Sequence, residues 1–221
     1  MFRDKFSPSL VLALFSRLLA AAQPDWPTQT LQPGFVFFDG KAGNAAMDLG
    51  LEDFLAHPEP PIVFTQGSTA VHAPGGFYSV SVEAAARLGR RALLLGAPAG
   101  DWGANVYAAT YAPYAQVFPR AAINVHQGGS GTVGEALRAG RPQLIVPFGW
   151  DQPDNGMRVE RLGAGIHLPR TAYTVSSAMV ALDRLLHEAH FAERAARAAR
   201  EMQAEDAVPA ACDALEALLE S

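Results

Sequence analysis

A short apolar segment that runs straight into a glycine-rich loop constrains the fold of this chain more than any other feature. Residues 123–125 have the composition of a buried strand, and glycine occupies three of the four positions 128–131. Glycine lets backbone N–H groups come close to a bound group, because it has no side chain in the way. We predict that Thr132 begins a helix whose positive end points back at the glycines. A strand, a glycine loop and a helix in this order predict an anion-binding site.

The residues on either side of this loop indicate which anion it binds. His126 stands directly before the glycine loop, two residues ahead of Gly128, where its ring can donate a hydrogen bond to a phosphoryl oxygen. Asp151 and Gln152 follow the next predicted strand and offer the acceptors and donors that suit sugar hydroxyls. A diphosphate on one side of the loop and a sugar on the other indicate a nucleotide sugar.

The pattern of apolar residues beyond position 62 predicts an α/β fold. Short apolar runs alternate with helical segments, which is typical of a parallel sheet with helices on both faces. The predicted strands are residues 62–65, 92–95, 106–109, 123–125, 143–146 and 166–168, and the predicted helices are residues 78–88, 132–139 and 155–162. We expect Asp154 and Asn155 to cap the last of these helices. Residues 176–186, 191–203 and 208–219 predict a helical C-terminal tail.

The opening of the chain has a weaker pattern. The spacing of its leucines predicts a packed helix over residues 9–22, followed by a strand over 35–38 and a loose connection over 39–61. The first 26 residues resemble a signal peptide, but Arg17 interrupts the apolar stretch. No apolar run approaches the roughly 20 residues that a membrane span requires. We therefore expect neither secretion nor stable membrane insertion.

Composition excludes several classes of partner and site. A formal net charge of −5 without a basic cluster argues against nucleic acid and anionic membranes as partners. A single cysteine, Cys212, excludes an intramolecular disulfide and fits the reducing cytoplasm, and we expect its thiol to be buried in a helix. His187 and His190 lie three residues apart without a third ligand nearby in the sequence. They predict a solvated helix face and no metal site.

The segments around the glycine loop resemble a known family. They read His-Gln-Gly-Gly-Ser-Gly-Thr from residue 126, Leu-Arg-Ala-Gly-Arg-Pro-Gln-Leu-Ile-Val-Pro-Phe from residue 137 and Asp-Gln-Pro-Asp-Asn from residue 151. This series is similar to the donor-binding, C-terminal half of the Leloir glycosyltransferases with the GT-B fold, especially the bacterial branch acting on macrolides, glycopeptides and sterols. The resemblance implies a Rossmann-like, nucleotide-sugar binding domain over residues 41–221. Residues 1–40 resemble the end of the acceptor domain and the segment that joins the two domains.

The resemblance also implies a reaction. Members of this family transfer a hexose from a nucleoside diphosphate sugar to a hydroxyl of a small lipophilic acceptor, with inversion and generally without a cofactor or an essential metal. The substrate would be a UDP-sugar or a dTDP-sugar. In the family the catalytic base is a histidine near the start of the acceptor domain, and no residue of this chain matches that position. The catalytic residue is therefore unknown. We expect the chain to need a separate acceptor-domain chain, or to associate with itself.

Binding roles for single residues follow from the same resemblance. The residues expected at the diphosphate are His126, Gly128, Gly129, Ser130, Gly131, Thr132 and Ser68. Glu135 is expected at the ribose and Tyr111 at the base. The residues expected at the sugar are Trp150, Asp151 and Gln152.

Alternative interpretations stay open for parts of this pattern. Thr132 and Glu135 also have the spacing of a capping box, in which the glutamate bonds the first N–H groups of its helix. Residues 129–134 satisfy the dinucleotide fingerprint G-x-G-x-x-G. A nicotinamide site also needs an acidic residue where the next strand ends, but that strand stops at Pro147, and Asp151 lies well beyond it. A further alternative is a non-catalytic module that binds nucleotide sugars.

Overall fold

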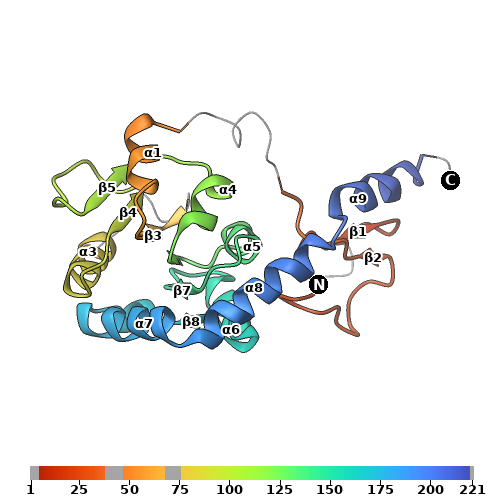
Figure 1. The fold of residues 1–221 in the computed structure, drawn as a ribbon. Coiled ribbons are helices and arrows are strands. Elements are labelled where there is room, and N and C mark those ends of the chain that lie inside the picture. Colours follow the sequence, from red (N-terminus) through yellow and green to blue (C-terminus); the bar gives the residue numbers. More distant parts are fainter. Residues whose placement is uncertain (1–4, 38–46, 68–75, 220–221) are drawn as a thin grey trace.

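A six-stranded parallel sheet forms the centre of the computed structural model, which describes residues 5–37, 47–67 and 76–219 (Figure 1). The strand order is β5-β4-β3-β6-β7-β8. The strands are β3 (Ile62–Thr65), β4 (Ala92–Leu95), β5 (Val106–Ala109), β6 (Ile123–His126), β7 (Gln143–Ile145) and β8 (Gly165–His167). Each strand begins and ends within about one residue of its predicted place. The predicted α/β fold is confirmed.

The central strands are predominantly apolar because helices cover them on both faces. Every residue of β3, β4, β6 and β7 is buried, as expected for parallel strands between two helical layers. Phe64 on β3 pairs in register with Leu94 on β4 and with Val125 on β6. Neighbouring residues of a strand point to opposite faces, so Val63 and Leu93 face the other layer.

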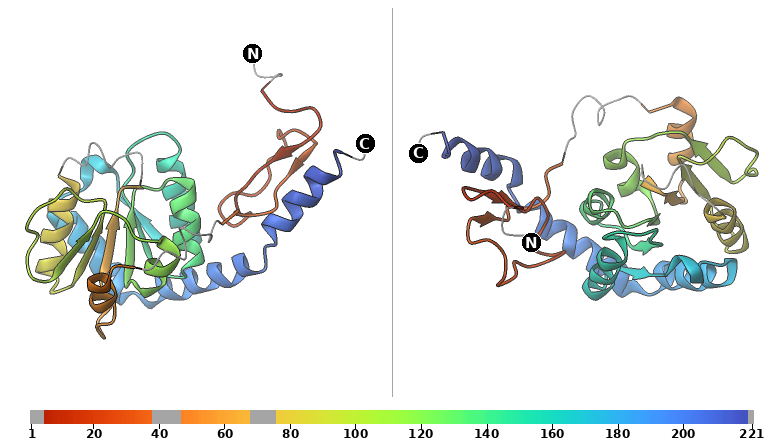
Figure 2. Two further views of the ribbon diagram at one scale, coloured as in Figure 1. Left: turned by 90° about the horizontal axis from the view of Figure 1, so that it is seen from above. Right: turned by 180° about the vertical axis from the view of Figure 1, so that it is seen from behind.

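Helices pack against the sheet (Figures 1 and 2). Three apolar clusters attach them to it. Helices α3 (Phe77–Arg87) and α7 (Val175–His187) share a cluster with Phe64 and Leu94. Helices α1 (Leu49–Leu55) and α4 (Tyr114–Val117) pack with Val63 and Leu93. Helices α5 (Ser130–Arg138), α6 (Gln152–Leu162) and α8 (Ala189–Gln203) share the third cluster with Ile145. The predicted helical tail is confirmed, and it ends in α9 (Ala207–Glu216).

The opening segment lies apart from the main sheet. Strands β1 (Val11–Leu12) and β2 (Thr30–Leu31) form a two-stranded parallel sheet of their own, and α9 lies beside it (Figure 2). The helix predicted over residues 9–22 is therefore wrong. The predicted domain boundary between residues 40 and 41 lies outside the described residues.

Contacts with distant residues explain why no helix forms there. The Gln32 side-chain amide donates hydrogen bonds to the backbone oxygens of Phe15, at 3.2 Å, and Ala20, at 2.8 Å. The buried Ser16 hydroxyl donates to the Glu205 carboxylate at 2.6 Å. These partners stabilise an irregular backbone, and the leucine spacing could not reveal them.

Two further expectations about secondary structure and one about burial are corrected. A strand is predicted over residues 35–38, but Phe35 is not in a strand. It packs beside Val133 in a buried cluster. Phe38 lies outside the described residues. The predicted loose connection contains α1, whose first turn is capped by the Asp48 carboxylate. The Cys212 side chain is exposed, because α9 buries only its small alanines against the molecule.

The two helices that follow the motif segments, α5 and α6, begin two and three residues earlier than predicted. Helix α5 begins at Ser130, two residues before Thr132, and Gly129 is its N-cap. Helix α6 begins at Gln152, with Asp151 as its N-cap and a proline in its first turn, so Asp154 and Asn155 lie inside the helix and do not cap it. Among the described helices, none has the length and apolar character needed to cross a membrane.

Candidate functional site

A cavity of about 570 Å³ lies at the carboxyl ends of the central strands. The chain order reverses there, because β3 has β4 on one side and β6 on the other, and ligands of open α/β sheets bind at such a point. The lining residues are Thr65, Gly67, Leu95, Gly96, Thr110, Tyr111, Ala112, Tyr114, Gln127, Gly129, Ser130, Gly131, Thr132 and Glu135. The cavity therefore brings the glycine loop together with Tyr111 and Glu135, whose binding roles stay predictions.

The glycine loop leaves the first turn of α5 open toward this cavity. Gly128 has a φ of +92°, and a Cβ atom there would lie 2.7 Å from Ile145 Cγ2, so only glycine fits. Gly129 caps the helix without a side-chain hydrogen bond. The first backbone N–H groups of a helix have no partner within the helix. The loop thus presents N–H donors and the positive end of α5 to a ligand.

His126 supports this loop from inside the sheet. Its Nε2 lies 3.0 Å from Gln143 Oε1, and its Nδ1 accepts a hydrogen bond from the Gly128 N–H at 3.1 Å. Complete burial lowers the pKa of His126 to about 4, which the hydrogen bond to Gln143 opposes. The ring is neutral at pH 7, with its proton on Nε2 for Gln143. Both ring nitrogens are engaged within the protein, so direct donation to a diphosphate stays a prediction that requires one of these bonds to break.

Tyrosines form the far wall of the cavity. Tyr111 lines the cavity and is 65% exposed, so its ring is accessible for stacking with a planar group. Sequence reasoning missed Tyr114, whose hydroxyl lies 2.9 Å from Thr65 Oγ1 and whose ring stacks on Phe118. Burial raises the pKa of Tyr114, so its hydroxyl stays protonated. The repeated tyrosine at positions 111 and 114 was the available signal for this wall.

Glu135 lies on the cavity with its carboxylate in an ion pair. Its Oε2 accepts from Arg138 Nη2 at 2.8 Å, one turn further along α5. The alternative capping box does not form, because α5 begins at Ser130 and Thr132 is buried within the helix. Sequence reasoning also missed Gln127, which is buried against Gly67 and Gly129 and whose Oε1 has no hydrogen-bond partner among the described residues.

The three residues expected at the sugar occupy different environments. Trp150 is 78% exposed, with a φ of 55°. It lines neither this cavity nor a second cavity, which lies beside Ser130. Gln152 is buried, and its Oε1 accepts from the N–H groups of Phe148 and Gly149. Asp151 lines the second cavity. The expected diphosphate residue Ser68 lies outside the described residues.

The structure gives no support for a nicotinamide site or a metal site in the described part of the chain. Strand β7 ends at Ile145, and Asp151 lines the second cavity, so no carboxylate from this segment reaches the first cavity. Residues 5–37, 47–67 and 76–219 contain no group of three side chains placed to hold a metal ion. His187 and His190 lie on exposed surface, which confirms the predicted solvated face.

Comparison with known proteins identifies the family. The family described as erythromycin biosynthesis protein CIII-like, C-terminal domain, matches residues 97–218, which is more than half of the chain. The chain belongs to this family. The resemblance inferred from the motifs is therefore confirmed.

Relatives of this CIII-like domain are glycosyltransferases. The O-mycaminosyltylonolide 6-deoxyallosyltransferase of Streptomyces fradiae is 37% identical over 195 residues, covering 81% of this chain and 46% of the relative. A sterol 3-beta-glucosyltransferase of Arabidopsis thaliana is 32% identical over 161 residues, covering 69% of this chain and 24% of the relative.

Solved structures show the same fold. Spinosyn rhamnosyltransferase complexed with thymidine diphosphate matches with a TM-score of 0.79 at 24% identity, over 96% of this chain and 57% of that chain. The glycotransferase of kitacinnamycin matches with a TM-score of 0.76 at 24% identity, over 94% of this chain and 54% of that chain. These matches show that the chain has the fold found in GT-B glycosyltransferases. The chain spans a little more than half the length of these solved proteins. It spans less than half the length of the two curated relatives.

Proposed function

We propose that this chain is the donor-binding half of an inverting glycosyltransferase in the cytoplasm. It would bind a UDP-sugar or a dTDP-sugar and act on the hydroxyl of a small lipophilic acceptor. The observation that carries this proposal is the cavity at the carboxyl ends of β3 and β6, which is lined by the open first turn of α5, by Glu135 further along the same helix and by Tyr111. A diphosphate suits the N–H groups of α5, a ribose suits a carboxylate, and a base suits a tyrosine ring.

The contribution of this half to catalysis is electrostatic. Negative charge grows on the diphosphate as the bond to the sugar breaks, and N–H donors held in place beforehand stabilise that charge. The loop is held in place by the Gly128 N–H bond to His126 and by the Asn155 side-chain amide, which donates to the Gly128 oxygen at 2.9 Å. We propose that deprotonation of the acceptor comes from an acceptor domain outside these 221 residues.

Calorimetry with UDP, dTDP and NAD tests this proposal on the purified chain. Binding of UDP or dTDP supports it. Tight binding of NAD without a response to either diphosphate would overturn it in favour of the dinucleotide fingerprint. Diphosphate binding with no transfer in the presence of an acceptor domain would favour the non-catalytic module.

A substitution at the first position of α5 tests the backbone donors separately. Ser130→Pro removes one N–H but keeps the helix, because proline suits this position and Gly129 has an extended ψ of 142°. We expect affinity for the bare diphosphate to fall about tenfold to a hundredfold, since hydrogen bonds to charged groups contribute about 1.5–3 kcal/mol. Ser130→Ala is the control, because it keeps the N–H. Equal affinities for the two variants would remove this N–H from the site.

A further inference from the structure

The cavity lined by the glycine loop, Tyr111 and Glu135, which the proposed function assigns to the nucleotide, is called the nucleotide cavity. A second cavity, of about 390 Å³, adjoins it. The two cavities share Ser130, the first residue of α5. One wall of the second cavity comes from the opening segment and the other from the first turns of α6. Its lining residues are Phe15, Leu19, Ala20, Ala21, Gln23, Trp26, Ser130, Asp151, Asp154, Asn155 and Arg158. Nothing in the sequence motifs assigns Trp26, Asp154 or Arg158 to a site.

The shared residue defines what the second cavity adjoins. Under the proposed function, on which this inference rests, the diphosphate lies at the first turn of α5. A nucleotide sugar carries its nucleoside on one side of the diphosphate and its sugar on the other. The nucleoside side is the cavity with Tyr111 and Glu135. The sugar must therefore extend from the diphosphate on the side away from that cavity. The second cavity lies on this side, because Ser130 at the first turn of α5 also lines it.

The α6 wall offers hydrogen-bonding groups fixed relative to the glycine loop. The Asn155 side-chain amide donates to the Gly128 oxygen at 2.9 Å and to Asp151 Oδ2 at 2.8 Å. Arg158 Nε donates to Asp154 Oδ2 at 2.6 Å. Two carboxylates and a guanidinium supply acceptors and donors for hydroxyl groups.

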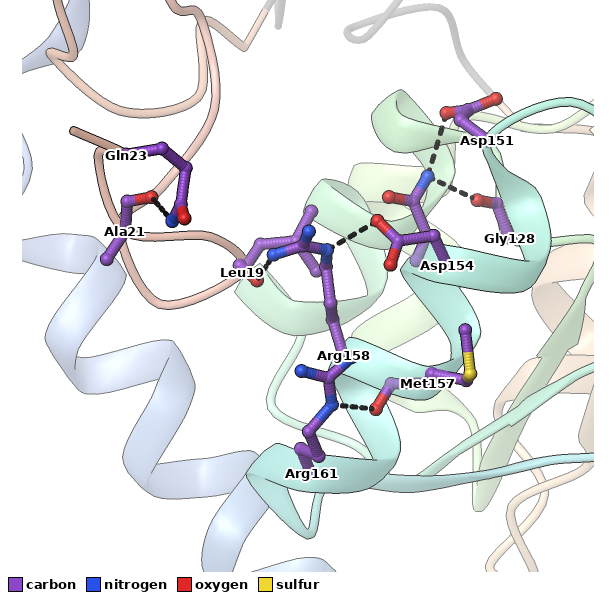
Figure 3. Close-up of polar contacts among 10 residues, drawn as sticks. Leu19, Ala21, Gln23, Gly128, Asp151, Asp154, Met157, Arg158 and Arg161 are labelled. Carbon is purple, nitrogen blue, oxygen red and sulfur yellow. Dashed lines mark hydrogen bonds and ion pairs between the residues drawn. The ribbon is translucent and has the colours of Figure 1, made fainter. Parts of the chain in front are cut away.

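The opposite wall is apolar and held in position. The rings of Phe15 and Trp26 meet edge to face with centroids 5.9 Å apart, and Leu19 is buried beside them. Arg158 Nη1 donates to the Leu19 backbone oxygen at 3.4 Å, which links this wall to α6 (Figure 3). Gln32 braces the same segment through the oxygens of Phe15 and Ala20.

We propose that this second cavity receives the sugar of the donor, and that Trp26 and Arg158 are sugar-binding residues. A hexose has one ring face rich in C–H groups and a rim of hydroxyls, which matches an aromatic wall opposite a charged one. The cavity volume lies in the range of about 300–1,000 Å³ that small-molecule sites occupy. Asp151 keeps the sugar role predicted from the sequence. In this proposal the aromatic side chain at the sugar is Trp26, and not the exposed Trp150.

Nuclear magnetic resonance of the bound donor gives the direct test. The chain is mixed with UDP-glucose or dTDP-glucose, and intermolecular contacts are recorded between sugar protons and the tryptophan indoles, with Trp26→Phe assigning the Trp26 signals. We expect contacts from the glucose ring to Trp26. Contacts to Trp150 alone, or a bound nucleotide whose sugar touches no tryptophan, would overturn the proposal.

Paired arginine variants on α6 give the second test. Arg158→Ala should lower the affinity for UDP-glucose or dTDP-glucose about tenfold and leave the affinity for UDP or dTDP unchanged. Arg161→Ala is the matched control, because Arg161 bonds the Met157 oxygen one turn away and does not line the cavity (Figure 3). Equal losses for the sugar-bearing and the bare diphosphate would overturn the sugar role. A chain that binds neither diphosphate would show that the proposed function itself fails, and this inference with it.

Discussion

His126 shows how the fold changes the chemistry of a single residue. A histidine in an unfolded chain titrates near pH 6.5, whereas burial lowers the pKa of His126 to about 4. Between these values the unfolded chain binds more protons than the folded one. The stability contributed by neutral His126 is therefore complete above about pH 6.5 and decreases as the pH falls toward 4, by about 3 kcal/mol in total. Urea unfolding between pH 7.5 and 4.5, together with a titration of the His126 ring by nuclear magnetic resonance, checks this. A ring that titrates near 6.5 in the folded chain would contradict it.

Gly128 tests whether the loop geometry depends on glycine. Gly128→Ala places a side chain at a φ of +92°, with its Cβ 2.7 Å from Ile145 Cγ2 and 3.0 Å from the Gln152 oxygen. We expect the free energy of unfolding to fall by about 1–3 kcal/mol from the backbone strain alone. Gly131→Ala is the control, because no heavy atom lies within 4 Å of the added Cβ in α5. Urea unfolding compares the two variants, and equal stabilities would contradict the expectation.

Among the elements, the connection between α8 and α9 determines the position of the opening segment. Glu205 lies at this connection and accepts the hydrogen bond from the buried Ser16. Ser16 Oγ would still accept from the Leu18 N–H at 3.0 Å, but Glu205→Ala would leave the buried Ser16 O–H without an acceptor, which costs about 1–3 kcal/mol. We expect faster amide hydrogen exchange in β1 and β2, with the exchange of the six-stranded sheet unchanged.

Glu201→Ala provides the matched control for this experiment. Glu201 lies one turn earlier on α8, in a half-exposed ion pair with Arg197, and such surface pairs contribute about 0–1 kcal/mol. Its removal should leave the exchange of β1 and β2 unchanged. Identical exchange in the Glu205 and Glu201 variants would show that Ser16 does not fix the opening segment.

At the scale of the whole molecule, we predict that this chain alone does not transfer sugar to a hydroxyl acceptor. A general base must lie within hydrogen-bond reach of the acceptor proton, and in the family the base lies in the other domain. Phe6, Leu14 and Val36 are also large apolar side chains that are exposed on the opening segment. Adding an acceptor-domain polypeptide should therefore restore transfer and raise the melting temperature through binding. A coupled assay for released diphosphate, with and without that polypeptide, measures both hydrolysis and transfer.

Robust transfer by the purified chain would contradict this prediction and place the base within these 221 residues. His57, which is exposed in the connection before β3, would then be the first residue to mutate. His72 would be the second, although it lies outside the described residues. Loss of transfer in one of these variants, with diphosphate binding retained, would identify the base.

The sequence by itself determined the main sheet and the position of the cavity beside the glycine loop. Parallel strands covered on both faces are predominantly apolar, so β3, β4 and β6 are readable as short runs bounded by turns. A glycine loop after β6 can serve few purposes other than close approach of the backbone to a ligand. Local signals of this kind depend on neighbouring residues. The family resemblance, and not a local signal, implied binding roles for Tyr111 and Glu135, and the structure places both on the cavity that the glycine loop lines.

Only the tertiary structure decided which groups are available to a ligand. His126 and Gln152 match the motif, but contacts with Gln143 and with the turn before α6 engage their polar atoms. Conversely, Trp26 and Arg158 are more than 100 residues apart in the chain and meet only because the opening segment packs on α6. Burial, pKa and the walls of a cavity depend on such long-range contacts. A sequence pattern, which relates residues a few positions apart, does not contain them.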